Sequence, residues 1–176
     1  SRTWKVFGDR EKIVKAAIIE NGKIFILFDD DHCAEIFPKG KRTTVIPTVT
    51  AFPRLHHVLK SFRFSFECMD EQGLRSIYYV DRRWNFFKRT PSRDQLIVGP
   101  SSFNRSDTFA ELTDAIRKRN LVQKPNEQLF ITGAMPDPND ENFLFFFLAH
   151  RKYIKFDIRT RTVVEILDLT QGWPGV

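Results

Sequence analysis

The residues Asp29-Asp30-Asp31-His32-Cys33 bring carboxylate, imidazole and thiol groups together in five consecutive positions. Such groups are ligands for divalent cations. Adjacent residues of a strand point to opposite faces, so only alternate ones could share an ion unless a turn gathers them. No second cluster with ligand spacing accompanies the run. We interpret it as a solvated acidic turn between two strands, and we expect no metal or other cofactor.

The histidines offer a second kind of chemistry. His56-His57 is a tandem pair, and His150 lies beside Arg151. Imidazoles can bind metal or titrate near neutral pH, but catalysis also needs a placed nucleophile, an orienting carboxylate or an oxyanion donor. None of the patterns GxSxG, HExxH, Walker A or GxGxxG occurs. We therefore expect that the protein is not an enzyme, and a metal-dependent hydrolase at Asp29–His32 is the least favoured alternative.

Two stretches mix cations with aromatic rings. Residues 82–93 carry five Lys or Arg and no acid, and residues 151–161 carry five more. A guanidinium pairs bidentately with carboxylate or phosphate, and a ring buries a large area at an interface. From these stretches we predict a partner-binding surface made of six residues: Arg82, Arg83, Trp84, Arg89, Arg151 and Tyr153.

The charge of the whole chain favours anionic partners. Lys and Arg total 28 against 22 Asp and Glu, a formal net charge of +6. The first hypothesis is a non-enzymatic interaction module that binds a protein or an acidic polymer through the basic-aromatic surface. The alternative is a domain that binds single-stranded nucleic acid such as RNA, with cations on phosphates and exposed rings stacked on bases. The same rings could instead form a buried sheet face with cationic edges.

The elements that must position these residues are indicated by phenylalanine, which supplies 18 of the aromatic residues. These rings occur in short runs bounded by turn residues, as is typical of strands. Asn21-Gly22 favours a tight hairpin in the first run. The predicted strands form three meanders: Ala16–Ile19, Lys23–Phe28 and Ala34–Phe37; then Arg63–Cys68, Arg75–Val80 and Trp84–Lys88; then Gln128–Thr132, Phe143–Ala149, Tyr153–Ile158 and Thr162–Leu167.

One helix is predicted from Ser106 or Asp107 to Arg119, because Phe109, Leu112 and Ile116 form an apolar stripe. A weaker helical pattern covers Leu55–Ser61. The segments Thr90–Asn104 and Ala134–Asn142 contain Pro, Gly or Asn and are predicted to be connections.

The predicted fold class is mainly β, with antiparallel meanders and one or two short helices. The length of 176 residues fits one domain, 1–176, with 1–90 and 104–176 as sub-blocks. The longest apolar run, Phe143–Ala149, is far shorter than the roughly 20 residues of a transmembrane helix, so no transmembrane segment is expected. Cys33 and Cys68 could pair with each other or remain buried free thiols.

The meanders resemble the blades of hemopexin-type propellers, which have an entry segment like Asp-Ala-Ala-Phe and a strand like Tyr-Trp-Arg-Phe-Asp. Lys15-Ala16-Ala17-Ile18 and Asp114-Ala115-Ile116 look like entry segments, and Phe145-Phe146-Phe147 precedes Tyr153-Ile154-Lys155-Phe156-Asp157. A looser copy ends in Arg83-Trp84-Asn85-Phe86-Phe87. Trp4 lies in a similar outer strand, and Trp173-Pro174-Gly175 is similar to a linker between blades. The resemblance implies a diverged or incomplete small propeller that binds protein or glycan, with an ion held by backbone carbonyls near Ala16 and Ala115.

Overall fold

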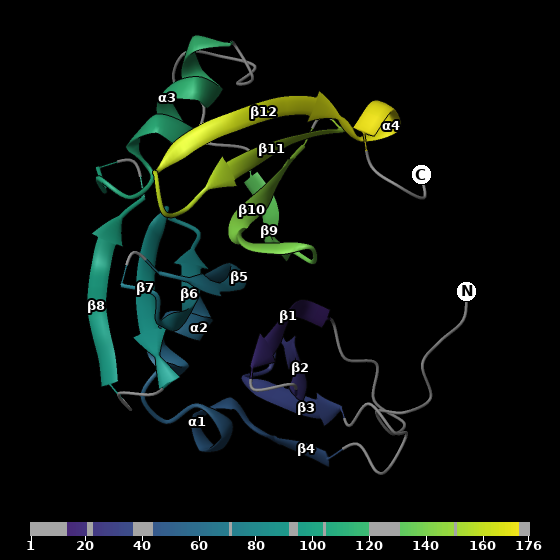
Figure 1. The fold of residues 1–176 in the computed structure, drawn as a ribbon. Coiled ribbons are helices and arrows are strands. Elements are labelled where there is room, and N and C mark those ends of the chain that lie inside the picture. Colours follow the sequence, from purple (N-terminus) through teal and green to yellow (C-terminus); the bar gives the residue numbers. More distant parts are fainter. Residues whose placement is uncertain are drawn as a thin grey trace. The chain divides into compact units, whose positions relative to one another are not determined.

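The computed structural model describes residues 14–20, 23–36, 44–70, 72–91, 95–103, 105–119, 131–149 and 151–172. These residues form three four-stranded antiparallel sheets with short helices between them (Figure 1). Each sheet is a meander of four consecutive strands, so the predicted mainly β fold with antiparallel meanders is confirmed. Contacts divide the chain into two compact units, residues 1–64 and 65–176. None of the helices in the described ranges is long and apolar enough to cross a membrane.

The first sheet consists of β1 (Val14–Glu20), β2 (Lys23–Phe28), β3 (His32–Ile36) and β4 (Thr44–Pro47). The helices α1 (Thr48–Ala51) and α2 (His56–Lys60) follow it. The predicted pairing of β1 with β2 is confirmed, with Glu20 opposite Lys23, whereas the predicted turn residues Asn21-Gly22 lie outside the described residues. Cys33, on β3, is a buried free thiol, and burial raises its pKa.

The second sheet consists of β5 (Phe62–Met69), β6 (Arg75–Asp81), β7 (Asn85–Thr90) and β8 (Gln95–Ser102). Buried and half-buried residues alternate along the whole of β5, as the spacing of its phenylalanines predicts. Cys68 is also a buried free thiol.

The helix α3 (Ala110–Lys118) leads to the third sheet, which consists of β9 (Ile131–Asp137), β10 (Asp140–Leu148), β11 (Lys152–Asp157) and β12 (Thr162–Asp168). The short helix α4 (Leu169–Gly172) follows it. The predicted helix at 106–119 exists, but it begins later because the Ser106 hydroxyl accepts a hydrogen bond from the Thr108 N–H and holds a turn there.

A cluster of buried rings forms the core of the unit 65–176. Phe109, the residue before α3, stacks on Phe103 with ring centroids 4.4 Å apart. Its ring also contacts Phe86 of the second sheet and Phe146 of the third, at 5.6 and 6.1 Å. All four rings are buried. Two rings on strands, Phe86 of β7 and Phe146 of β10, thus meet two rings from the connection between β8 and α3.

The three sheets repeat one local geometry. In each, the turn between the second and third strands ends in a left-handed residue: Asp31 (φ 60°), Trp84 (φ 62°) or Arg151 (φ 57°). The carbonyl of that residue accepts a hydrogen bond from the N–H of the residue that follows the fourth strand, at 2.8, 2.7 and 2.7 Å for Thr48, Phe103 and Leu169. The predicted repetition of meanders is therefore a repetition of structure, while the propeller stays a prediction.

A buried ion pair is also repeated, in the second and third sheets. Lys88 Nζ lies 2.6 Å from an Asp70 carboxylate oxygen, and Lys155 Nζ lies 3.0 Å from one of Asp137. Each lysine is the fourth residue of the third strand, and the aspartates lie at the last residue of the first strand (Asp137) or directly after it (Asp70). Each pair therefore joins the first and third strands of its sheet, which are not adjacent, at an equivalent position.

Two predicted connections are wrong. The segment Thr90–Asn104 contains β8, and Ala134–Asn142 contains the end of β9 and the start of β10. Pro100 and Pro136 lie in these strands, and both β8 and β9 are at the edge of their sheets. An edge strand tolerates proline because the missing N–H can face away from the ladder.

Candidate anion-binding site

The turn between β6 and β7 holds two of the predicted arginines at the surface. Arg82 and Arg83 are both exposed, and no described residue forms an ion pair or hydrogen bond with either guanidinium. The buried carboxylate of Asp81 accepts hydrogen bonds from the N–H groups of Arg83 and Asn85, both at 2.8 Å. Because this carboxylate fixes the backbone of the turn, the two arginine side chains extend from a rigid base.

Trp84 does not have the predicted role. It was expected to begin a strand and to present its ring to a partner, but it is the left-handed residue of the turn and is only 3% exposed. Its ring lies 6.3 Å from that of Phe103, and its carbonyl accepts the Phe103 N–H. Trp84 therefore anchors the turn to the connection between β8 and α3.

The other predicted binding residues do not lie together. Arg89 is half-buried near the far end of β7, four residues and roughly 13 Å along the strand from Asn85, at which β7 begins after the turn. Arg151 is exposed at the start of β11, beside Tyr153. Tyr153 is buried, with its ring edge-on to Phe145 at 5.6 Å, and cannot serve as an exposed ring. Of the six predicted residues, only Arg82 and Arg83 form a candidate site.

Two further arginines lie near that turn and were not among the predicted site residues. Arg105 follows β8, two residues after Phe103, and Arg159 lies in the turn between β11 and β12. A chain of contacts brings these segments together: Phe103 packs on Trp84 and on Phe109, and Phe109 packs on Phe156 at 6.1 Å. In Figure 1 the β6–β7 turn, the connection from β8 to α3 and the β11–β12 turn lie near the start of α3. We call Arg82, Arg83, Arg105 and Arg159 the arginine rim.

A hydrogen bond to α3 completes this arrangement. The Glu111 carboxylate accepts the Val163 N–H at 3.0 Å and so ties the helix to the start of β12. Arg159 belongs to the basic stretch 151–161, but Arg105 has only Asn104 and Ser106 as its neighbours in the chain. Only tertiary packing brings Arg105 to the rim.

Three carboxylates near the rim, those of Asp81, Glu111 and Asp157, accept backbone N–H groups. Asp157 accepts the N–H groups of Arg159 and Thr160 at 2.9 and 3.0 Å, much as Asp81 does in its own turn. Burial alone would raise the pKa of Asp157, but these hydrogen bonds, together with the charge of Arg159, lower it below its usual value. The guanidiniums of the rim are exposed, whereas the acids hold the turns that carry them.

The residues Asp29–Asp31 form an exposed turn between β2 and β3, as predicted. The His32 ring nitrogen Nδ1 lies 2.9 Å from the Asp30 carbonyl and 3.4 Å from its carboxylate. Within the described ranges, no group of three or more His, Cys, Asp or Glu side chains is placed to hold a metal ion. His56 and His57 lie on α2 with ring centroids 6.3 Å apart, and His150 lies outside the described residues.

Neither known protein families nor curated proteins match this chain in sequence comparisons. The resemblance to hemopexin-type blades stays a prediction. Of its motifs, Tyr153–Asp157 lies on β11, and Lys15–Ile18 lies on β1, the first strand of its sheet. Asp114-Ala115-Ile116 lies in the helix α3 and does not begin a sheet. Trp4 and Trp173-Pro174-Gly175 lie outside the described residues.

Proposed function

We propose that this protein is a non-enzymatic interaction module that binds an acidic surface of a partner protein through the arginine rim. The observation that carries the proposal is the pair of exposed guanidiniums, Arg82 and Arg83, on a turn that a buried carboxylate and a buried tryptophan hold rigid. Arginines on a rigid base lose little backbone freedom on binding and can each pair bidentately with a carboxylate.

The local charge favours a protein over a polyanion. The segments 81–84, 103–111 and 157–163 together contain five arginines and four acids, so their net charge is only slightly positive. Recognition of a polymer with one charge per repeat relies on a strong positive field. An acidic protein surface needs only discrete guanidinium–carboxylate pairs. A protein partner is therefore the better match.

The alternative function, binding of single-stranded RNA, needs exposed rings on which bases can stack. The rings in the predicted stretches that were to serve this purpose, those of Trp84, Phe86 and Tyr153, are at most 5% exposed. No described feature of the rim therefore favours this alternative.

The proposal can be tested with a fluorescein-labelled peptide of alternating Glu and Gly, followed by fluorescence anisotropy. We expect saturable binding that the double variant Arg82→Glu/Arg83→Glu weakens by at least about tenfold, because each charge reversal removes an exposed pair that contributes up to about 1 kcal/mol and adds a repulsion. The matched control Lys118→Glu/Arg119→Glu makes the same charge change at the exposed end of α3.

Equal losses in the two double variants would show that only net charge matters and would contradict the rim as a site. Tighter binding of an oligo(U) probe than of the acidic peptide, again lost on Arg82→Glu/Arg83→Glu, would replace the proposal by the RNA-binding alternative.

A further inference from the structure

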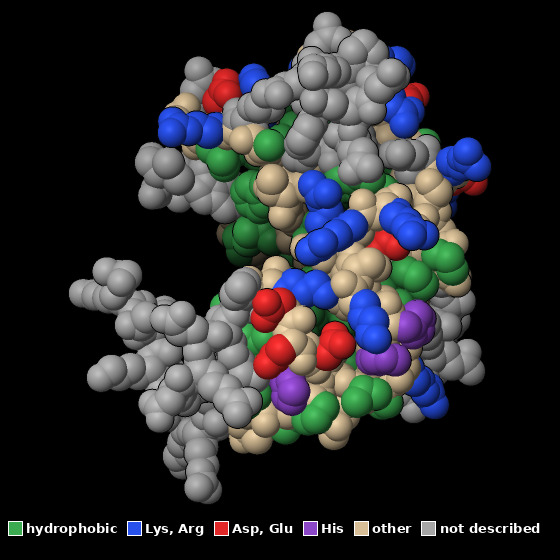
Figure 2. Space-filling model, turned by 180° about the vertical axis from the view of Figure 1, so that it is seen from behind, with side chains coloured by type: hydrophobic (Ala, Val, Ile, Leu, Met, Phe, Trp, Pro, Cys, Tyr) green, Lys and Arg blue, Asp and Glu red, His purple; other side chains and the backbone are tan. Residues whose placement is uncertain are grey.

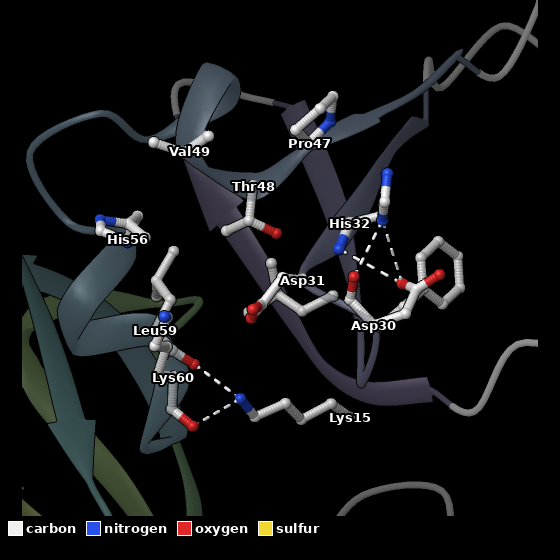
Figure 3. Close-up of a pocket in the computed structure, with 12 residues that line it drawn as sticks. Lys15, Asp30, Asp31, His32, Pro47, Thr48, Val49, His56, Leu59 and Lys60 are labelled. Atoms are coloured by element: carbon white, nitrogen blue, oxygen red, sulfur yellow. Dashed lines mark hydrogen bonds and ion pairs between the residues drawn. The ribbon is translucent and has the colours of Figure 1, made fainter.

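A cavity of about 350 Å³ lies within the first unit, between the β2–β3 turn and the helices α1 and α2 (Figure 3). Its apolar lining includes the buried side chains of Leu27, Phe28 and Leu59. Its size is within the range of pockets that hold small organic molecules, and such pockets combine an apolar wall with a few fixed polar groups. None of the residues that line this cavity belongs to the arginine rim.

Asp31 is the fixed polar group. Its backbone is held in the left-handed conformation at φ 60°, and its carbonyl accepts the Thr48 N–H at 2.8 Å. In Figure 3 the Asp31 side chain points toward Leu59 and Lys60 of α2. No described residue forms a hydrogen bond or ion pair with this carboxylate. Asp31 is exposed but lines the cavity together with the apolar side chains, and its carboxylate has free capacity to accept hydrogen bonds from a cationic ligand.

Lys15 also lines the cavity, but its charge is used elsewhere. Its Nζ donates hydrogen bonds to the carbonyls of Leu59 and Lys60, at 2.8 and 2.7 Å. These carbonyls lie at the carboxyl end of α2, where a helix favours a cation. Lys15 therefore ties β1 to α2.

Figure 2 shows one face of the molecule on which Asp or Glu, His, and Lys or Arg side chains lie close together at the surface. Among the residues that line the cavity, Asp30 is engaged with His32, and His56 is half-buried on α2. Asp31 is thus the one carboxylate of the lining that has no described partner.

We propose that this cavity binds a small organic ammonium ligand, with Asp31 as the counter-ion of the ammonium group and with Leu27, Phe28 and Leu59 as the wall for its carbon chain. The ammonium group of the ligand donates hydrogen bonds to the Asp31 carboxylate. The carbon chain of the ligand moves from water into contact with the apolar wall. Both contributions favour a primary amine with several carbons over an inorganic cation or an anion.

The test uses hexylamine as the probe and ¹⁵N-labelled full-length protein at pH 7, observed by NMR. We expect saturable shifts of the amide signals of residues 27–32 and 56–60. Asp31→Asn should weaken binding by at least about tenfold, since it removes a charged hydrogen bond. Asparagine tolerates positive φ, so this variant should fold.

The matched control is Asp29→Asn, which removes the same charge from the same turn. Asp29 and Asp31 are both exposed, but only Asp31 lines the cavity. Asp29→Asn should therefore change the dissociation constant by no more than about twofold, because a charge outside the cavity acts on the ligand only through screening solvent. Three results would overturn the proposal: no saturable shift, equal weakening by the two variants, or binding of hexan-1-ol or hexanoate as tight as that of hexylamine. None of these results bears on the arginine rim.

Discussion

Arginine and tryptophan have different tasks in the turn between β6 and β7. Arg82 and Arg83 are exposed, whereas Trp84, next to them in the chain, is buried against Phe103. Residue types alone suggested that all three contact a partner, because Trp and Arg are both common in interfaces. What decides between them is the left-handed conformation of Trp84, which turns its ring inward, and this depends on the hydrogen bond from the Phe103 N–H. The sequence contains no local signal of that bond.

A prediction at the residue scale concerns the ion pair of Lys88 and Asp70, whose side chains are 13% and 1% exposed. Lys88→Met leaves a buried carboxylate without its counter-ion, so we expect the free energy of unfolding in urea to fall by about 3 kcal/mol. The control is Arg75→Met. Arg75 is 62% exposed and pairs with Glu67 and Glu141 at 3.3 and 3.2 Å, so its loss should cost at most about 1 kcal/mol. Equal costs for the two variants would contradict the buried role of Lys88.

At the scale of elements, the sequence predicted most strands well but missed three edge strands, which are β4, β8 and most of β9. The strands β2, β5, β6 and β11 were predicted within a few residues because their phenylalanines and β-branched residues lie between clear turns. β8 and the part of β9 from Ala134 onward were predicted as connections because they contain proline, and β4, which has only four residues, was not predicted. Proline is a signal against a central strand but not against an edge, and a single sequence does not show which strands are at the edge.

The connection of α3 to the sheets gives a prediction at this scale. Phe109 is fully buried and contacts rings from both sheets of its unit. Phe109→Ala should lower the free energy of unfolding by about 3–5 kcal/mol, because it removes a large buried side chain and leaves a cavity. Val164→Ala, at a side chain that is 53% exposed on β12, should change it by less than about 0.5 kcal/mol. A loss below 1 kcal/mol for Phe109→Ala, measured by urea denaturation, would show that the ring cluster does not form the core.

At the scale of the whole molecule, the repeated ion pairs predict how stability depends on pH. Burial alone would raise the pKa of Asp70 and Asp137, but backbone N–H groups and the paired lysines lower both below their usual value. Because the pKa is lower in the folded state, the stabilisation is complete above the unfolded-state pKa of about 4. It is lost as the pH falls through the folded-state values.

This dependence can be measured as the free energy of unfolding between pH 6 and pH 2. The double variant Asp70→Asn/Asp137→Asn should show a shallower decline below pH 4 than the unchanged protein. Asp107→Asn, at an exposed aspartate near α3, is the control and should leave the slope unchanged. If the double variant kept the original slope, these two carboxylates would not be the groups that link stability to pH.

In this fold, buried rings form the interior and acids stabilise the turns. The guanidinium groups of the arginine rim therefore remain available to a partner. The most direct measurement is an NMR titration of the arginine side-chain Nε–H signals with the acidic Glu-Gly peptide. The account predicts saturable shifts for Arg82, Arg83, Arg105 and Arg159, and no shift for Arg119 at the far end of α3. Shifts that are absent from the rim, or that are as large at Arg119, would contradict it.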